Sequence, residues 1–172
     1  IAEGKIESGD EKKLNALKGE TMAVIALCQF DLTRCFGYPY TKDNGASLGA
    51  PLIDHLVGTY ENPSRSTVAQ AYDFIIETLE EAVTLMSEEK NNGRMNKYAA
   101  RALLARVYLY HNDNRKAFDM ADQLIKDVDA SGSYALYPHE KYVAAWSVET
   151  KFGSESFFEI ANSVDDTPGR DS

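Results

Sequence analysis

The chain has 172 residues, of which 44% are hydrophobic and 10% aromatic, a size and composition that fit one folded domain and exclude a disordered chain. Its 27 acidic and 18 basic residues give a net charge of −9. This charge argues against binding to nucleic acid or to an anionic membrane, because both need clustered lysine and arginine. The printed sequence has no apolar run of about 18 residues and no signal-peptide pattern at its start, so it predicts a water-soluble chain.

The first predicted helix runs from Asp10 to Phe36. Acidic residues near its start and Arg34 near its end suit the helix dipole, and Gly37 predicts a left-handed residue that stops the helix. The second half of the helix has apolar residues on most sides. This pattern predicts that the helix is buried between several neighbouring elements.

Two cysteines, Cys28 and Cys35, fall within this helix. Seven residues of helix separate their Cα atoms by roughly 10 Å, which exceeds the roughly 7 Å that a disulfide spans. The spacing also lacks the pattern of a zinc site, so the sequence predicts two free, buried thiols and leaves the redox compartment open.

Residues 38–65 contain repeated glycines and prolines and show no sustained hydrophobic period, which predicts one long loop. Unstructured loops of this length are uncommon in compact domains and are often functional. This loop contains three tyrosines, Tyr38, Tyr40 and Tyr60. A second amphipathic helix is predicted to begin after Ser66 or Thr67.

Residues 96–128 predict a helical hairpin. Asn96 and Asn114 stand where helix caps belong, and the HNDN link between the two stretches is short enough to require antiparallel helices. The many alanines predict a close approach of the two helix axes. The predicted apolar stripes are Ala99, Ala100, Leu103, Leu104 and Val107 on one helix and Ala117, Phe118, Ala121, Leu124, Ile125 and Val128 on the other.

The hairpin resembles a tetratricopeptide unit, whose repeat is about 34 residues. Arg101 stands where that pattern has a tryptophan, and no proline closes the unit, so a generic helical hairpin is the alternative. The large, small and aromatic positions of the pattern are occupied by Leu104, Ala105, Tyr108, Ala117 and Ala121.

After the hairpin, the sequence predicts a short helix around Tyr142–Trp146 and one short strand within residues 154–162. Together with the preceding helices, these elements predict an all-α fold of tetratricopeptide-like hairpins with long loops. The short strand near the C-terminus is the only sheet element in this prediction.

The sequence shows no catalytic pattern. Nucleophile-elbow and phosphate-binding glycine motifs do not occur, and the three histidines, His55, His111 and His139, lie far apart without a metal-ligand spacing. A glycosidase needs two carboxylates about 5–10 Å apart across the sugar, and nothing distinguishes Glu155 and Glu159 from solvated acidic residues. The sequence therefore predicts a protein that is not an enzyme and uses no metal or cofactor.

Several segments in order resemble the SusD/RagB family: GETMAVIALCQFDLTRCFGYPYTKDNGASLGAPL, then Arg65-Ser66-Thr67-Val68, GRMNKYAARALLARVYLY, AxxxADQLI, YALYP and SESFFEI. The resemblance extends from about Leu17 to Ile160. Two departures are Thr21, where the family often has alanine, and Ile25, where it often has arginine. The second departure affects a buried polar contact and leaves the fold in place.

The resemblance implies a single helical SusD-like domain over residues 1–172, with the loop 38–65 inside it, as a fragment of a longer chain. Family members are outer-membrane lipoproteins of Bacteroidetes that capture glycans or other nutrients for a SusC-like TonB-dependent transporter. The expected function is thus non-enzymatic nutrient capture, most simply of a glycan, at the cell surface. The membrane anchor is a lipid, and the lipid-bearing cysteine and signal peptide are absent from the printed sequence. The alternative is a tetratricopeptide-type protein-interaction scaffold.

Ligand-binding candidates come from the residues themselves, because the family motif does not place the ligand site. Sugars present apolar C–H faces to aromatic rings and hydroxyl groups to polar side chains. Tyr38, Tyr40 and Trp146, the only tryptophan, are the candidates on this basis. The alternative for each ring is packing against the helices.

Overall fold

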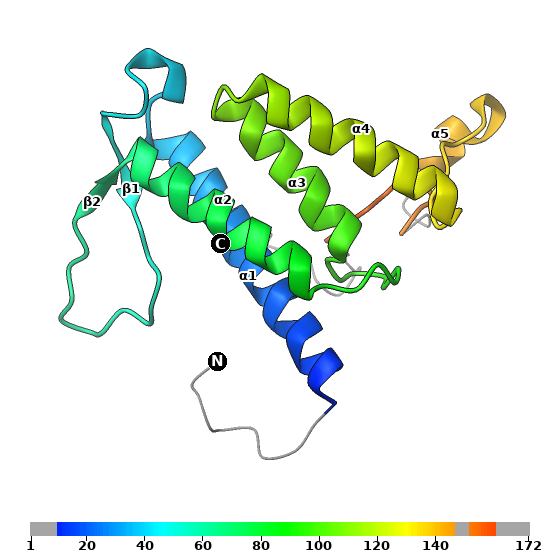
Figure 1. Cartoon of the computed structure of the whole chain (residues 1–172), viewed down its shortest axis with the longest axis horizontal. Helices are drawn as coiled ribbons and strands as arrows, with labels where there is room; N and C mark the ends of the chain where they lie inside the picture. The colour runs from blue at the N-terminus through cyan, green and yellow to red at the C-terminus, as the bar shows by residue number, and fades with distance from the viewer. Residues whose placement is uncertain (1–9, 147–151, 161–172) are drawn as a thin grey trace, which may run out of the picture.

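The computed structural model describes residues 10–146 and 152–160. Within these ranges the chain is mainly α-helical, with one small sheet, so the all-α prediction is confirmed (Figure 1). The elements are α1 (Glu11–Phe36), η1 (Tyr40–Lys42), β1 (Leu48–Pro51), β2 (Arg65–Thr67), α2 (Val68–Leu85), α3 (Lys97–Tyr110), α4 (Asn114–Ser131), η2 (His139–Lys141) and α5 (Tyr142–Ala145).

α1 and α2 form an antiparallel pair that packs on α3 (Figure 1). Asp10 caps α1 by accepting a hydrogen bond from the main-chain N–H of Lys12 at 3.0 Å. Small residues line the contact between the two helices, because Ala23 and Ala26 of α1 and Ala82 of α2 are fully buried. Their short side chains allow the two axes to approach closely, the arrangement that the sequence predicted for the following hairpin.

Gly37 ends α1 in a different way from that predicted. Its φ of −107° and ψ of 168° are extended, so the prediction of a left-handed residue is wrong. A Cβ at this position would lie 2.7 Å from the carbonyl oxygen of Thr33, 3.1 Å from Val68 Cγ2 and 3.4 Å from Gly49 Cα, so glycine serves both the turn out of the helix and the close approach to the start of α2. The chain therefore passes directly from α1 over the start of α2.

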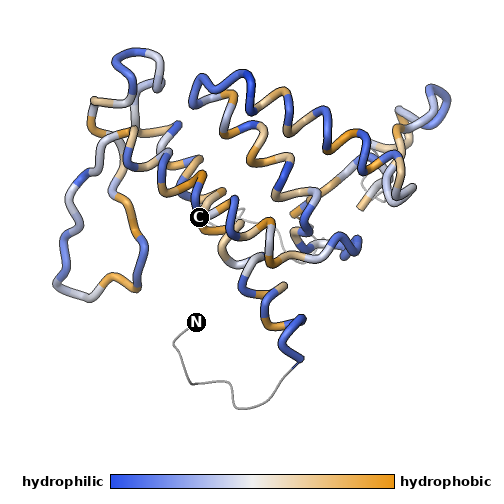
Figure 2. The backbone as a smooth tube through the Cα atoms, in the orientation of Figure 1, coloured by the Kyte–Doolittle hydropathy of each residue, from blue (hydrophilic) through white to orange (hydrophobic). Residues whose placement is uncertain are grey.

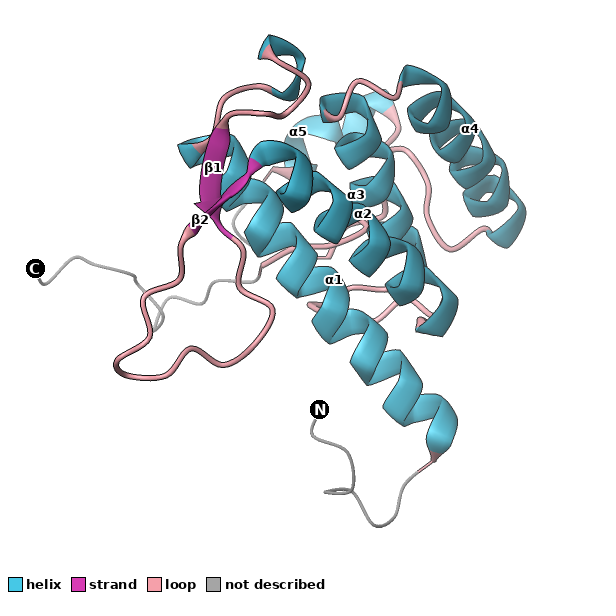
Figure 3. Cartoon of the chain, turned by 60° about the vertical axis from the view of Figure 1, so that its left-hand side comes forward, coloured by secondary structure: helices cyan, strands magenta, loops and turns pink. Residues whose placement is uncertain are grey.

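Residues 38–65 are not one unstructured loop, which corrects the prediction. β1 pairs with β2 in antiparallel register, with Leu48 opposite Thr67 and Pro51 opposite Arg65, and the loop between the two strands projects away from the helices (Figure 3). Arg65 reinforces this hairpin by donating from Nε to the carbonyl oxygen of Gly49 at 2.7 Å.

The strand predicted near the C-terminus is absent from the part of that segment that the structure describes, residues 154–160. The apolar side chains of this segment, Phe157 and Phe158, instead pack against the helical core. A strand needs a neighbouring strand to pair its main-chain hydrogen bonds, and this segment has none among the described residues. The segment instead follows the path that lets its two phenylalanine rings pack on the helices.

The predicted start of the second helix is confirmed. The Thr67 hydroxyl accepts from the N–H of Gln70 at 3.1 Å, and the Gln70 side chain accepts in return from the N–H of Thr67 at 2.9 Å. This reciprocal capping box satisfies two main-chain donors at the start of α2.

The α3–α4 hairpin is confirmed, with one change of cap. The Asn96 side chain accepts from the N–H of Ala99 at 3.0 Å and caps α3. At α4 the cap is Asp113, which accepts from the N–H of Lys116 at 3.1 Å, whereas Asn114 is the first residue of the helix. The link has one residue fewer than predicted, because Asn112 takes a left-handed conformation with φ of 70° and reverses the chain.

The apolar stripe of α3 is buried as predicted, but that of α4 is only partly so. Ala117, Leu124 and Val128 are buried, whereas Phe118 and Ile125 are 66% and 62% exposed. α4 lies at the outer edge of the helices, and its buried side packs on α3 and on the segments that hold Tyr134 and Phe157, so the other side of its stripe stays exposed (Figure 1). Hydrophilic residues cover much of the rest of α4 (Figure 2).

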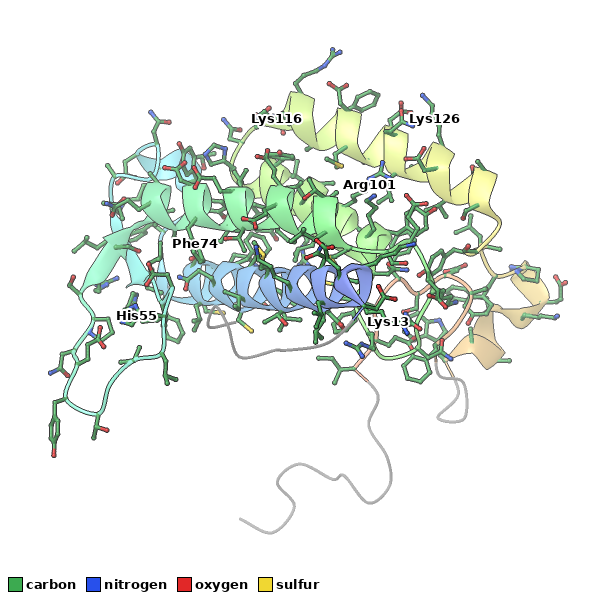
Figure 4. All side chains as sticks on the ribbon, turned by 60° about the horizontal axis from the view of Figure 1, so that its bottom comes forward. Lys13, His55, Phe74, Arg101, Lys116 and Lys126 are labelled. Carbon is green, nitrogen blue, oxygen red and sulfur yellow. The ribbon has the colours of Figure 1, made fainter. Side chains whose placement is uncertain are left out.

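Arg101 occupies the tryptophan position of the tetratricopeptide pattern and joins the two helices by an ion pair. Its Nη1 lies 2.6 Å from Asp127 Oδ2, and only 11% of its side chain is exposed, beneath α4 (Figure 4). Hydrogen bonds from Gln123 and then Arg101 hold the pKa of Asp127 below its usual value. At the position where the tetratricopeptide pattern has a packed tryptophan, this chain therefore joins α3 to α4 by the ion pair of Arg101.

Candidate functional site

The chain after α4 is anchored by a buried tyrosine. Gly132 ends α4 in a left-handed conformation with φ of 63°, which redirects the chain toward α3. Tyr134 follows, 7% exposed, with its ring edge-on to Tyr98 and to Phe157 at centroid distances of 6.0 and 4.8 Å. Its hydroxyl oxygen accepts from Asn96 Nδ2 at 2.7 Å, and burial raises the pKa of the phenol. The cap of α3 therefore also positions the segment that leads to α5.

Hydrogen bonds hold residues 152–160 against this segment. The N–H of Ala135 donates to the carbonyl oxygen of Ser154 at 3.0 Å, and the N–H of Tyr137 donates to a carboxylate oxygen of Glu155. Lys90 Nζ donates to the carbonyl oxygen of Gly153 at 3.0 Å. Together these contacts place the Tyr137 ring beside Gly153, where a Cβ would overlap the tyrosine hydroxyl.

A hollow of about 330 Å³ lies between these segments and α5. Trp146, at the end of α5, is 77% exposed, and Tyr142 is 50% exposed with its ring centroid 6.2 Å from that of the tryptophan. We call this the α5 hollow. It is lined by Tyr137, Tyr142, Ala145, Trp146, Gly153, Glu155, Ser156 and Glu159.

The lining of the α5 hollow combines open aromatic rings with hydrogen-bonding groups. Exposed aromatic rings provide a flat apolar face for C–H groups, and carboxylate and hydroxyl oxygens accept hydrogen bonds from ligand hydroxyls. Glu155 and Glu159 are each oriented by a main-chain donor, the N–H of Tyr137 and of Phe152 respectively. Two carboxylates at the hollow disfavour an anionic ligand, so its chemistry suits a neutral, hydroxyl-rich molecule.

The other two candidate residues lie far from Trp146. Tyr40 begins η1 and Tyr38 lies just before it, at the opposite end of the molecule from α5 (Figure 1). Tyr38 is 57% exposed, with Lys42 Nζ 3.1 Å from its ring centroid. Tyr40 is partly buried and packs on the rings of His111 and Tyr72 at centroid distances of 4.2 and 5.6 Å. The three candidates therefore do not form one site, and the packed ring of Tyr40 holds η1 against the helices.

Sequence reasoning did not connect Trp146 with Tyr137, Tyr142 or the two glutamates. The signal was present in the spacing of aromatic residues through YALYPHEKYVAAW, at residues 134–146. The glutamates come from a separate segment, however, and only the contacts of residues 152–160 with this loop bring them to the rings.

A second hollow, at the start of α1, has a structural explanation. Glu20 of α1 accepts from Arg94 Nε at 3.0 Å and from the N–H of Met95 at 3.2 Å, which fastens the segment before α3 to α1. The charged groups of Glu20 and Arg94 at this hollow therefore pair with each other. In residues 10–146 and 152–160, no group of three or more histidine, cysteine, aspartate or glutamate side chains is placed to hold a metal ion.

The fold defines the class of protein: a helical protein of tetratricopeptide-like hairpins, with exposed aromatic rings at the α5 hollow. Residues 3–109 match the family described as "Starch-binding associating with outer membrane". This match covers more than half of the chain, and the chain belongs to this family of SusD-like proteins. None of the helices that the structure describes is long and apolar enough to cross a membrane.

Solved structures agree with the family. A SusD superfamily protein from Bacteroides vulgatus is 95% identical, with a TM-score of 0.94 over 100% of this chain and 39% of its own. One from Bacteroides thetaiotaomicron is 42% identical, with a TM-score of 0.88 over 96% of this chain and 35% of its own. A SusD-like carbohydrate-binding protein from Bacteroides vulgatus is 25% identical, with a TM-score of 0.77 over 93% of this chain and 33% of its own.

The chain spans 33–39% of the length of these three proteins. No curated protein matches it.

Proposed function

We propose that this chain is the helical-repeat part of a non-enzymatic glycan-capture protein of the outer membrane, and that the α5 hollow contacts the glycan. The observation that carries the proposal is the exposure of Trp146 and Tyr142, 77% and 50%, beside two oriented carboxylates. Large aromatic rings are usually buried, so two adjacent open rings at a hollow favour a ligand site. The description of the family as starch-binding and of one relative as carbohydrate-binding supports the same ligand class.

The experiment is glycan binding by the intact protein, measured by calorimetry with a panel of neutral and anionic oligosaccharides. Trp146→Ala is expected to weaken binding of the preferred neutral glycan about 5- to 30-fold, a loss of about 1–2 kcal/mol of stacking and contact area. Oligosaccharides rich in uronic acid are expected to bind more weakly, because Glu155 and Glu159 repel their carboxylates.

The matched control is Tyr60→Ala. Tyr60 is 95% exposed on the loop between β1 and β2, remote from α5, so its removal deletes an open aromatic ring without touching the hollow. Equal affinity of the parent, Trp146→Ala and Tyr142→Ala would exclude the α5 hollow as the glycan site. Chromatography of the same mixtures tests the non-enzymatic part, and cleaved oligosaccharides would contradict it.

Transfer of the captured glycan to a SusC-like TonB-dependent transporter is part of the proposal and rests on the family resemblance. Its test is co-purification of the intact protein with such a transporter from detergent-solubilised outer membranes. A protein that reaches the outer membrane and binds glycan but does not co-purify would separate capture from transport.

Interaction with another protein is the second candidate function, and the exposed apolar residues of α4 favour it. Phe118 and Ile125 lie seven residues apart, two turns along one side of the helix, and are 66% and 62% exposed. Phe118→Ser with Ile125→Ser should abolish partner binding and leave glycan affinity unchanged if α4 is a docking face. An unchanged partner affinity would exclude this face.

A further inference from the structure

α1 has two opposite apolar faces, and the described chain covers only one of them. The covered face packs on α2 and includes Ala23, Ala26 and Phe30, all fully buried. In the view of Figure 3, α1 runs across the front with no described helix or strand over it. The exposed residues of the second face are Leu17, Val24, Ile25, Cys28, Leu32, Cys35 and Phe36.

This uncovered α1 face is long and its central positions are uncharged, with Lys18 and Asp31 at its two margins. Positions 17, 21, 24, 28, 32 and 35 recur at helical spacing and carry no ionisable acid or base other than the two thiols. From Leu17 to Phe36 the helix rises roughly 28 Å. A water-facing helix surface normally carries charged or polar side chains, and a helix that is apolar around most of its circumference is normally buried. Yet Ile25 and Leu32 are each 42% exposed, and Phe36 is 67% exposed.

The two cysteines of this face are also exposed to solvent, although free cysteine is usually buried. Both thiols lie on the uncovered α1 face and are exposed, so the prediction of buried thiols is wrong for the described chain. The physical reason is their position on the helix, opposite the stripe that packs on α2. Both are free, as their separation along the helix requires.

An apolar hollow continues the uncovered α1 face beyond the end of the helix. It has a volume of about 630 Å³ and is lined by Leu32, Phe36, Gly49, Ala50, Pro51, Ile53, Pro63 and Arg65. Arg65 does not make the hollow polar, because its guanidinium group donates to the carbonyl oxygens of Gly49 and Leu48 at 2.7 and 3.0 Å. The helix face and the hollow therefore form one continuous apolar surface.

We propose that the remainder of the same polypeptide packs on this surface in the intact protein. A protein 95% identical to this chain has only 39% of its length matched by it, so more than half of such a polypeptide is available to cover the face. A segment of the same chain is held at high effective concentration, which favours it over a second copy or a separate partner. The occupant presents apolar side chains, one of which enters the hollow beside Phe36 and Pro63.

Thiol protection in the intact protein tests the proposal. The protein is expressed from its complete gene, treated in its native state with N-ethylmaleimide, and digested for mass spectrometry of the peptides that contain Cys28 and Cys35. Thr84→Cys supplies the control, because Thr84 is exposed on α2, away from the uncovered α1 face. Both native thiols should react roughly 100-fold more slowly than the introduced one, since reagent reaches a covered thiol only when the structure opens.

Two outcomes overturn the proposal. Labelling of Cys28 and Cys35 at the rate of the introduced cysteine would show that the face is open to solvent. Protection that is lost on dilution, together with a change from dimer to monomer in light scattering, would identify a second copy as the occupant. Protection that is independent of concentration in a monomer supports the proposal. Because the readout involves no glycan, it is independent of whether the α5 hollow binds one.

Discussion

Gly19 lies at a close approach of α1 to the end of α2, and Gly19→Ala tests that contact. A Cβ on Gly19 would lie 2.7 Å from Met86 Cγ, 2.9 Å from the carbonyl oxygen of Ala82 and 3.0 Å from Leu85 Cβ. The methionine side chain is flexible and can move. The carbonyl oxygen belongs to the main chain of α2, so relief of that overlap requires the two helices to separate.

Two effects of opposite sign set the size of the change. Alanine is the better helix former by about 1 kcal/mol, which stabilises the variant. Overpacking of a close interface costs about 1–3 kcal/mol. Because the nearest fixed atom is main chain, we expect the steric cost to prevail and the free energy of unfolding to fall by about 1 kcal/mol net.

Urea unfolding of the intact protein, followed by circular dichroism, measures this difference. The control is Thr84→Ala, exposed on α2 and away from the uncovered α1 face, whose hydroxyl donates to the carbonyl oxygen of Glu81 within its own helix. This control should gain a few tenths of a kcal/mol from helix propensity alone. If Gly19→Ala is as stable as Thr84→Ala, the argument from close helix approach is refuted.

Ala117→Leu should destabilise the protein by about 1–3 kcal/mol in the same unfolding assay, because Ala117 is only 8% exposed in the α3–α4 contact. Phe118→Ser, at an exposed neighbouring position, should change stability by about 0.5 kcal/mol or less. Equal effects of the two substitutions would contradict the close packing of α3 on α4. The pKa of His55 is raised by its hydrogen bonds to Asp54 and then Glu61, at 2.6 and 2.7 Å, on the projecting loop (Figure 4), so an NMR titration should place its pKa above about 6.5, and Glu61→Gln should lower it. The contribution of this contact to loop stability should be complete below the unfolded pKa of histidine and lost as pH rises through the folded pKa of His55. Acid should also remove the contribution as pH falls through the folded pKa values of Asp54 and Glu61, both of which are lowered. An unshifted histidine pKa would show that the contact does not form in solution.

Local patterns in the sequence determined the helices and several of their ends. Asp10, Thr67 and Asn96 were identifiable as helix starts because a cap acts on main-chain groups two or three residues away. The order of motifs identified the family for a similar reason, since each motif is a local arrangement of packing residues. The buried stripe of α3 also followed directly from helical spacing.

Tertiary structure decided everything that depends on which neighbour meets which face. Spacing showed that Phe118 and Cys28 lie on apolar stripes, but a stripe does not specify whether another element covers it. Gly37 serves close approach to Val68, a contact between residues far apart in sequence. The α5 hollow likewise could not be predicted from the sequence, because Trp146 and Glu155 come from separate segments that long-range hydrogen bonds bring together. Periodicity and capping act within a few residues of chain, whereas burial and sites arise from contacts between distant segments.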